Sequence, residues 1–355
     1  MAKRLSKKWA NYRRRYHYLR RTVEPPNGPL YLNVEPTNAC NLKCYHCSID
    51  GSRKRGMMDL ELFRRVIDQA WDAGVYEVAL FLGGEPLLHK RLPEMISYVH
   101  DKGLESRVYT NACLLTRERS EEILDAGLDF LGVSIDGDNR EEYEAMRVGA
   151  DFDEVVANIM AFLELKKERG QDRPYVSFQM IKLKENPRQF IDPAFIARFD
   201  GLPVDEFSFR NPHDWRGEKE GEISVDTGER YYPCQVFWSA MSVAWDGRVV
   251  GCSADLNGRQ IFGDLSRETI MDVWNGEEMK RHRRLLKERR YEELPLCASC
   301  HALWYNGKDM RLSLLSQLPP FEQLRAFVYR LNPKKWRQER ESRSPGAIRS
   351  RKQPD

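Results

Sequence analysis

The sequence predicts an α/β protein whose sheet is largely parallel, followed by a smaller segment rich in cysteine. Short apolar strand segments alternate with amphipathic helical segments over the first two thirds of the chain, and repeated β-then-α units imply parallel strands. Four cysteines gather in the last third. The chain has 355 residues, enough for more than one domain and a substantial core. Hydrophobic residues make up 41%, and no apolar run is long enough to span a bilayer.

Six strands and the helices between them account for this fold class. The predicted strands are residues 31–35, 75–82, 106–110, 130–135, 175–181 and 205–209. The predicted helices are residues 59–73, 92–102, 117–126 and 152–169, with a short helix at 195–199. In the first helix, Leu60, Phe63, Val66, Ile67 and Ala70 share one face. Ligands of such a sheet bind at the carboxyl ends of its strands.

Three cysteines follow the first strand directly. Cys40, Cys44 and Cys47 have the spacing C-x3-C-x2-C. Three thiolates leave one iron of a four-iron cluster with an open coordination position, where a ligand can bind and react. A zinc knuckle that uses His46 as a fourth ligand, or a disulfide pair, is the alternative. Because eight cysteines occur without a visible export signal, a reducing, cytoplasmic compartment and metal ligation are expected.

A glycine turn ends the second strand. Gly83, Gly84, Glu85 and Pro86 would let backbone groups approach a ligand closely. Together with the cysteine motif, this turn resembles the radical S-adenosylmethionine (radical SAM) superfamily. The resemblance implies a partial (β/α)6 TIM-like barrel. It also implies that SAM chelates the open iron, that the glycine turn holds the SAM amino group, and that His46 lies near the adenine.

Further SAM contacts are expected at the ends of the third and fourth strands. Asn111 ends strand three, Ser134 and Asp136 end strand four, and Arg147 follows. By resemblance, Ser134 and Arg147 contact the ribose or carboxylate of SAM. The alternatives are a helix cap for Asp136 and a solvated surface charge for Arg147. Ala112 stands where many relatives have glycine.

A second set of four cysteines can close a cluster completely. These are Cys234, Cys252, Cys297 and Cys300. Cys252 ends a predicted hairpin with an Asp-Gly turn at 246–247. The arrangement resembles the twitch domain, a shortened SPASM domain with one auxiliary [4Fe–4S] cluster. The barrel would thus be followed by a small auxiliary iron–sulfur domain, and a structural zinc site is the alternative.

The eighth cysteine, Cys113, is either a buried small hydrophobe or a hydrogen-atom donor to a substrate radical.

The basic N-terminal segment forms a predicted amphipathic helix. Residues 1–22 hold nine Lys or Arg and no acidic residue, whereas the chain as a whole is only +3. Its apolar stripe is Leu5, Trp9, Tyr12, Tyr16 and Leu19. We expect the helix to dock on the acidic barrel of the enzyme. The alternative is a peripheral contact with the inner membrane surface, and nucleic acid is not expected as a partner.

Five segments are expected along the chain. They are residues 1–29, the barrel 30–210, a linker across the barrel mouth 211–233, the auxiliary domain 234–305, and a C-terminal helix and basic tail 306–355. The linker carries a polar and aromatic set suited to a hydroxylated or anionic substrate, and a solvated linker is the alternative. This set is His213, Asp214, Trp215, Arg216, Asp226 and Arg230.

The resemblance implies reductive cleavage of SAM to a 5′-deoxyadenosyl radical that abstracts hydrogen from substrate. The auxiliary cluster would relay an electron, and a low-potential donor such as flavodoxin or ferredoxin would supply the first cluster. We expect an oxidoreductase acting on a small, sugar-like or otherwise hydroxylated substrate, by oxidation or epimerisation. A peptide or protein maturase ranks second, because some 29 residues before strand one leave little room for a leader-recognition domain. A non-catalytic electron-transfer protein is the weaker alternative.

Overall fold

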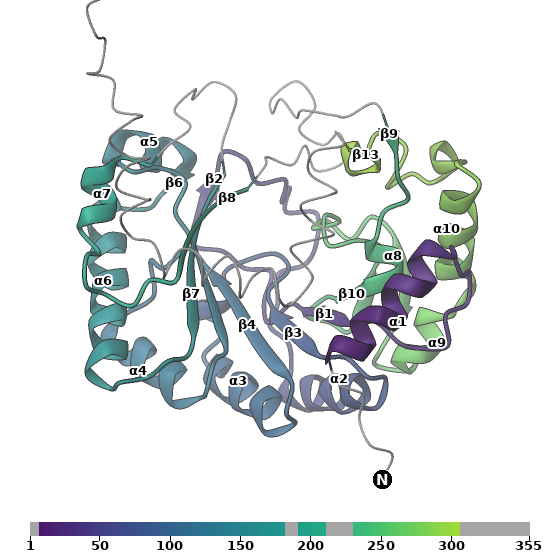
Figure 1. Ribbon diagram of the computed structural model, residues 1–355, viewed down its shortest axis with the longest axis horizontal. Coiled ribbons are helices and arrows are strands. Elements are labelled where there is room, and N and C mark those ends of the chain that lie inside the picture. Colours follow the sequence, from purple (N-terminus) through teal and green to yellow (C-terminus); the bar gives the residue numbers. More distant parts are fainter. Residues whose placement is uncertain (1–6, 182–190, 211–229, 306–355) are drawn as a thin grey trace, which may run out of the picture. The chain divides into compact units, whose positions relative to one another are not determined.

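The computed structural model describes residues 7–181, 191–210 and 230–305 (Figure 1). Two compact units are present. The first comprises residues 1–226 and 232–303, and the second comprises residues 227–231 and 304–355. In the second unit, strand β9 (Arg230–Tyr231) pairs antiparallel with β13 (Trp304–Tyr305). All that follows concerns the first unit.

Six parallel strands form the centre of the first unit, as the sequence predicts. They are β1 (Tyr31–Val34), β3 (Glu77–Leu80), β4 (Glu105–Thr110), β5 (Phe130–Ser134), β7 (Tyr175–Ile181) and β8 (Glu206–Arg210). Each pairs in parallel with the next in this order. In β1, Leu32 and Val34 are fully buried, whereas Tyr31 and Asn33 between them are partly exposed. This alternation assigns one side of the sheet to the core beneath the helices.

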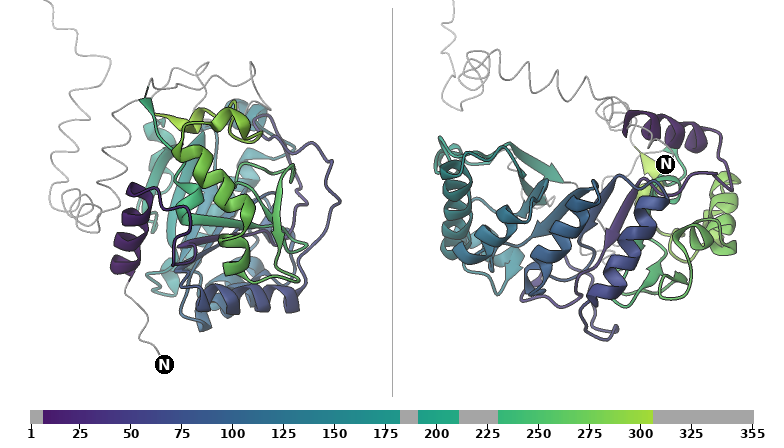
Figure 2. Two further views of the ribbon diagram at one scale, coloured as in Figure 1. Left: turned by 90° about the vertical axis from the view of Figure 1, so that its right-hand side faces the viewer. Right: turned by 90° about the horizontal axis from the view of Figure 1, so that it is seen from below.

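Helices lie along the outer side of the curved sheet (Figures 1 and 2). They are α2 (Leu60–Asp72), α3 (Leu92–Asp101), α4 (Arg117–Asp125), α5 (Arg140–Met146), α6 (Phe152–Glu168) and α7 (Pro193–Ala197). Asp59, Thr116 and Asp151 begin α2, α4 and α6, and each side chain accepts hydrogen bonds from backbone N–H groups of the first turn. The predicted stripe of α2 is buried as expected. The fold class is therefore confirmed.

The cysteine-rich region continues the same sheet. Its elements are α8 (Val236–Ser239), β10 (Ala240–Val243), β11 (Arg248–Val250), β12 (Ile261–Asp264), α9 (Ile270–Trp274) and α10 (Glu277–Lys287). The hairpin of β10 and β11 turns at Gly247, whose φ is 90°. Strand β10 pairs in parallel with β1, so the sheet has nine strands in the order β12-β11-β10-β1-β3-β4-β5-β7-β8. The auxiliary region thus shares a hydrogen-bonded sheet with the barrel.

Helix α1 (Lys7–Leu19) docks on this region, but with a different face from the predicted stripe. Tyr18 is buried and packs edge-on against Trp238 of α8, with ring centroids 5.7 Å apart. Trp9 and Tyr16, by contrast, are exposed. The helix therefore docks mainly on the cysteine-rich region, where docking on the acidic barrel was expected, and the predicted apolar stripe does not make this contact.

Several expected features lie outside the described residues. They are Leu5, the C-terminal helix and tail, and all the singled-out linker residues except Arg230. The predicted domain boundaries remain a prediction. In the described ranges 7–181, 191–210 and 230–305, no helix is long and apolar enough to cross a bilayer.

Candidate functional site

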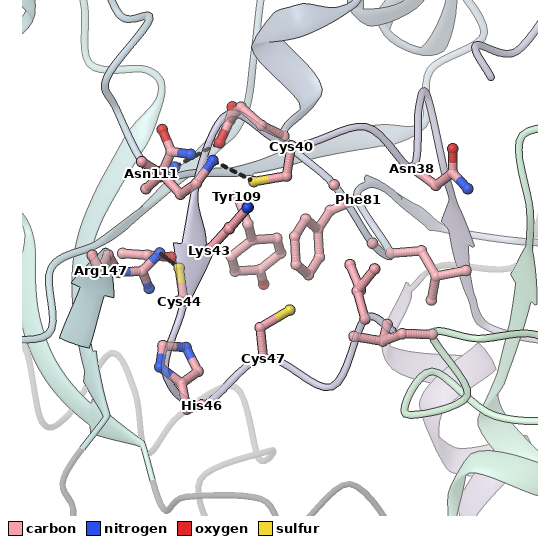
Figure 3. A pocket seen from close by; sticks show the side chains of 18 of the residues that line it. Asn38, Cys40, Lys43, Cys44, His46, Cys47, Phe81, Tyr109, Asn111 and Arg147 are labelled. Atoms are coloured by element: carbon pink, nitrogen blue, oxygen red, sulfur yellow. Dashed lines mark hydrogen bonds between the residues drawn. The ribbon is translucent and has the colours of Figure 1, made fainter. Parts of the chain in front are cut away.

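The first three cysteines line a cavity of about 530 Å³ at the carboxyl ends of the strands. Figure 3 shows their side chains along this cavity, with Arg147 beside Cys44. The loop that carries them follows β1, and the Leu42 N–H donates to Cys40 Sγ at 3.4 Å. Three thiols from one short loop therefore meet at one site.

Three thiols that line one cavity are a donor set that suits an iron–sulfur cluster. Burial raises the pKa of Cys40, and it raises that of Cys44 to about 11. The neighbouring thiols add to the pKa rise of Cys44, whereas Arg147 lowers it. Since only thiolates ligate metal, such a group needs a strong positive charge to lose its protons, and a bound cluster supplies it.

The glycine turn packs against the cysteine loop. Gly84 has φ of 72°, and a Cβ at this position would lie 2.5 Å from the carbonyl oxygens of Thr37 and Ala39. The Glu85 N–H donates to the same Ala39 oxygen at 2.8 Å. A side chain at residue 84 would therefore push the turn away from the cysteine loop.

Glu85 secures the turn to the end of β4. Its buried carboxylate accepts hydrogen bonds from the Thr110 hydroxyl at 2.7 Å, the Asn111 N–H at 2.8 Å and the Leu87 N–H at 3.0 Å. Burial raises the pKa of Glu85, and these donors oppose the rise. The Asn111 side chain in turn donates to Asn41 at 2.9 Å. The Glu85 carboxylate therefore connects the glycine turn to the end of β4 through buried hydrogen bonds.

Arg147 is held against the cysteine loop by a short strand pair. Strands β2 (Lys43–Cys44) and β6 (Arg147–Val148) run antiparallel, with Cys44 opposite Arg147. Asp136 accepts from Arg147 Nε at 2.7 Å and Nη2 at 2.6 Å, while Nη1 lies 3.8 Å from Cys44 Sγ. His46 Nε2 lies 3.8 Å from the same carboxylate. Asp136 thus orients the guanidinium toward the Cys44 sulfur.

Most of the predicted SAM contacts line the cavity. They are His46, Gly83, Gly84, Glu85, Asn111, Ser134 and Arg147. Pro86, Asp136 and Cys113 are not among its lining residues. Pro86 begins the 3-10 turn η1 (Pro86–Leu88) and Asp136 supports Arg147, neither of which requires contact with a ligand. Burial raises the pKa of the Cys113 thiol to about 11.

Cys234 lies near the three other late cysteines, although the four come from separate stretches of sequence. The Cys234 pKa is raised well above its usual value by burial first, and then by charges on Cys252, Cys300 and Cys297. Cys297 is buried and the other three are partly buried. Such a set of neighbouring thiols fits an auxiliary cluster. None of the eight cysteines is in a disulfide, and the described residues contain no group of three His, Cys, Asp or Glu placed to hold a metal ion.

Sequence reasoning missed the buried pair of Glu35 and Arg53. Arg53 Nη2 lies 2.5 Å from Glu35, and the same carboxylate accepts from the Gly83 N–H at 3.2 Å and the Trp245 N–H at 3.1 Å. Arg53 also donates to the Leu256 carbonyl at 3.0 Å. Glu35 directly follows strand β1, and a carboxylate at the carboxyl end of a strand could have indicated a residue of the site.

The cavity walls include other residues that carry no motif. Phe81 and Tyr109 extend from the ends of β3 and β4, with ring centroids 5.5 Å apart. Leu256 and Asn257 reach the cavity from the auxiliary region, and the Asn257 amide donates to the Ser48 carbonyl at 2.8 Å. The auxiliary region therefore forms part of the wall of the site.

Comparison with known proteins identifies both parts of the chain. The radical SAM superfamily matches residues 34–192, and an iron–sulfur cluster-binding domain, SPASM, matches residues 234–301. The chain is 25% identical over 315 residues to a tungsten-containing aldehyde ferredoxin oxidoreductase cofactor-modifying protein of Pyrococcus furiosus, covering 76% of this chain and 86% of the relative.

Two further relatives extend this comparison. A PqqA peptide cyclase of Gluconobacter oxydans is 26% identical over 284 residues, covering 70% of this chain and 77% of that protein. The crystal structure of Streptococcus suis SuiB bound to precursor peptide SuiA superimposes with a TM-score of 0.61 at 17% identity. It covers 83% of this chain and 74% of SuiB, and at that identity the likeness shows the fold alone.

The motifs, the cavity and the matches agree on the cofactors, which are SAM, a SAM-binding [4Fe–4S] cluster and auxiliary iron–sulfur. Cys40, Cys44 and Cys47 would hold the first cluster, and the four later cysteines the auxiliary one. The chain belongs to the radical SAM superfamily and carries a SPASM-type iron–sulfur domain.

Proposed function

We propose that this radical SAM enzyme is a maturase that modifies a peptide or protein substrate. The observation that carries the proposal is the match to a PqqA peptide cyclase, which spans both the barrel and the cysteine-rich region. This reverses the order expected from the motifs alone, in which a small hydroxylated substrate ranked first.

The size of the cavity supports a substrate that is mostly outside it. Its volume of about 530 Å³ is typical of a site for one small molecule. Because SAM is itself expected in this cavity, we infer that only one part of the substrate enters it, next to lining residues such as Phe81 and Tyr109.

The residues of the chain have distinct roles in this scheme. When bound, SAM and its cluster supply the ability to remove a hydrogen atom from an unactivated C–H bond. The backbone of Gly83 and Gly84 leaves room for the ligand, and Arg147 donates to the Cys44 sulfur. The rings of Phe81 and Tyr109 would form an aromatic wall beside the reacting group.

A second candidate is the modification of a small cofactor-like molecule. The match to the cofactor-modifying protein of Pyrococcus furiosus supports it, since that match covers most of both chains. In either case the net reaction would be an oxidation or a bond formation supported by an external low-potential electron donor and by the auxiliary cluster.

Size fractionation of the substrate pool separates the two candidates. The reconstituted, reduced protein and SAM are incubated anaerobically with large and small fractions of an extract from the source organism, and 5′-deoxyadenosine is measured. We expect stimulation by the large fraction, abolished when that fraction is first digested with protease. Stimulation only by the small, protease-resistant fraction would contradict the peptide proposal.

Two variants serve as controls for this measurement. Cys44→Ser removes a ligand of the first cluster and should abolish 5′-deoxyadenosine formation. Tyr45→Phe changes the same loop at an exposed side chain that does not line the cavity, so it should retain activity.

A further inference from the structure

Helix α1 presents an aromatic stripe to solvent. The stripe consists of Trp9, Tyr12, Tyr16 and Leu19, whose exposed fractions are 63%, 46%, 56% and 60%. In the part of the chain that the structure describes, no element covers these side chains. Four large apolar groups on one helix face form a patch that usually marks a contact with a partner or a membrane.

The opposite face of α1 fixes the helix to the enzyme. The Tyr18 hydroxyl donates to the Pro233 carbonyl at 2.9 Å, and its ring packs against Trp238. Trp238 Nε1 donates to the Thr22 carbonyl at 2.8 Å, which anchors the end of the segment. Arg14 is also buried on this side, with its guanidinium 5.9 Å from the centre of the Tyr31 ring. The stripe is thus held outward by contacts that do not involve it.

Arginines flank the stripe on both sides. With roughly 100° per residue, the stripe covers less than a quarter of the helix circumference, on the side opposite Arg14 and Tyr18. Arg13 and Arg20 project beside one edge of the stripe and Arg15 beside the other. Arg13 and Arg20 are exposed, and Arg15 is partly exposed. An apolar face bordered by cations is the pattern of a helix that lies in the plane of a membrane interface.

The charge of the segment indicates what the stripe contacts. Residues 1–22 carry nine Lys or Arg and no Asp or Glu, so an anionic surface is complementary to them. The segment 306–355 carries twelve Lys or Arg against five Asp or Glu, and like charge disfavours it as a cover for α1. Trp and Tyr are also the side chains enriched where headgroups meet the hydrocarbon region.

We propose that α1 docks this enzyme onto an anionic lipid bilayer. The aromatic stripe inserts at headgroup depth while Arg13, Arg15 and Arg20 lie against the phosphates. This surface site is distinct from the cavity and independent of which substrate the enzyme modifies. It would hold the enzyme at the membrane without a transmembrane helix.

Vesicle flotation of the full, cluster-loaded chain tests the proposal. The vesicles are phosphatidylcholine with phosphatidylglycerol, and phosphatidylcholine alone. One variant replaces all four stripe residues with serine, and another is R13Q/R15Q/R20Q. The matched control is Trp71→Ser on α2, which alters a tryptophan exposed by 41% outside the stripe.

We expect the wild-type chain and the Trp71→Ser variant to float with anionic vesicles and not with neutral ones. The partition coefficient should fall about tenfold or more in the stripe variant and in the arginine variant. Raising the salt concentration should weaken the wild-type binding. Because all changed side chains are exposed or partly exposed, iron content and melting temperature should match the wild type and exclude misfolding.

Several results would overturn the proposal. Flotation that is equal in wild type and stripe variant, or absent from both, removes its basis. Flotation that appears only after deletion of residues 306–355 would show that this segment covers the stripe. A stripe-dependent dimer in solution, or stripe-dependent binding of single-stranded RNA without vesicle binding, would assign the surface to a second copy or to nucleic acid.

Discussion

Arg147 lies between the Asp136 carboxylate and the sulfur of Cys44, a predicted ligand of the first cluster. Its guanidinium contacts Asp136 at 2.6 Å and Cys44 Sγ at 3.8 Å. An N–H donor and a positive charge beside a ligating sulfur stabilise the reduced, more negative cluster. The guanidinium should therefore raise the reduction potential of this cluster.

Replacing Arg147 with Gln should make the midpoint potential of the first cluster more negative, by a few tens of millivolts. An EPR-monitored redox titration without SAM measures this, and the auxiliary cluster of the same molecule is the internal control. Arg147→Lys keeps the charge and should shift the potential less. An unchanged potential in Arg147→Gln would show that the guanidinium serves SAM alone.

Ala112 adopts a backbone conformation that suits glycine. Its φ is 61°, and it is fully buried just after Asn111 at the end of β4. The left-handed region costs a residue with a Cβ about 1–2 kcal/mol. Ala112→Gly should therefore raise the free energy of unfolding by about 1 kcal/mol, allowing for the lost methyl contacts.

The melting temperature of the reconstituted protein measures this gain. Ala126→Gly is the matched control, because Ala126 ends α4 with φ of −71°. Glycine there should lower stability, since it adds freedom to the unfolded chain without relieving strain. A loss of stability in both variants would be inconsistent with strain at residue 112.

At the scale of one element, α10 places a buried histidine between aromatic rings. The His282 ring centroid lies 5.1 Å from that of Phe237 and 4.6 Å from that of Phe262, and Nδ1 lies 2.8 Å from the Glu278 carbonyl oxygen. Burial lowers the pKa of His282, because the charged ring would lose its hydration. Folding therefore favours the neutral form of this ring.

This lowered pKa predicts a loss of stability in mild acid. Above about pH 6.5 the ring is neutral in both the folded and the unfolded chain, so His282 neither binds nor releases a proton on folding. As the pH falls below that value, the unfolded chain binds a proton that the folded chain resists, and the free energy of unfolding declines. His282→Phe should reduce the change in melting temperature between pH 8 and pH 5.5, measured by circular dichroism.

His89 has a lowered pKa for the same reason and should contribute to the remaining pH dependence. His100→Gln, at an exposed position on α3, serves as the control. A pH dependence that is identical in wild type and His282→Phe would rule out a contribution from α10.

At the scale of the whole first unit, Glu35 joins three parts of the site. It contacts Arg53 of the segment after the cysteine loop, the Gly83 N–H of the glycine turn and the Trp245 N–H of the auxiliary hairpin. Both Glu35 and Arg53 are almost completely buried. Breaking such a pair leaves a buried charge without compensation.

Glu35→Gln should therefore lower the free energy of unfolding by about 3 kcal/mol and weaken SAM binding. Chemical denaturation and equilibrium dialysis of SAM measure the two effects. Replacing both partners, as in Glu35→Leu with Arg53→Met, should recover part of the stability. Glu94→Gln is the control, because its pair with Arg91 is exposed by about half and should contribute little. Equal effects of Glu35→Gln and Glu94→Gln would contradict the assigned role.

The fold class could be derived from the amino-acid sequence, and the cofactors followed from the family that its motifs resemble. Cysteine spacing and the glycine turn are local features, and their chemistry depends on neighbours along the chain. Apolar periodicity likewise reports which face of each helix or strand is buried, so all six strands and the hairpin turn at Gly247 could be predicted.

The way in which distant segments meet is visible only in the folded molecule. Cys44 and Arg147 come together through the short pair of β2 and β6, and β10 joins the barrel sheet beside β1. The docked face of α1 could not be predicted from its sequence pattern, because periodicity identifies an apolar face and not what covers it. Tyr18 and the aliphatic part of the Arg14 side chain pack against the enzyme. The more apolar stripe therefore faces the solvent.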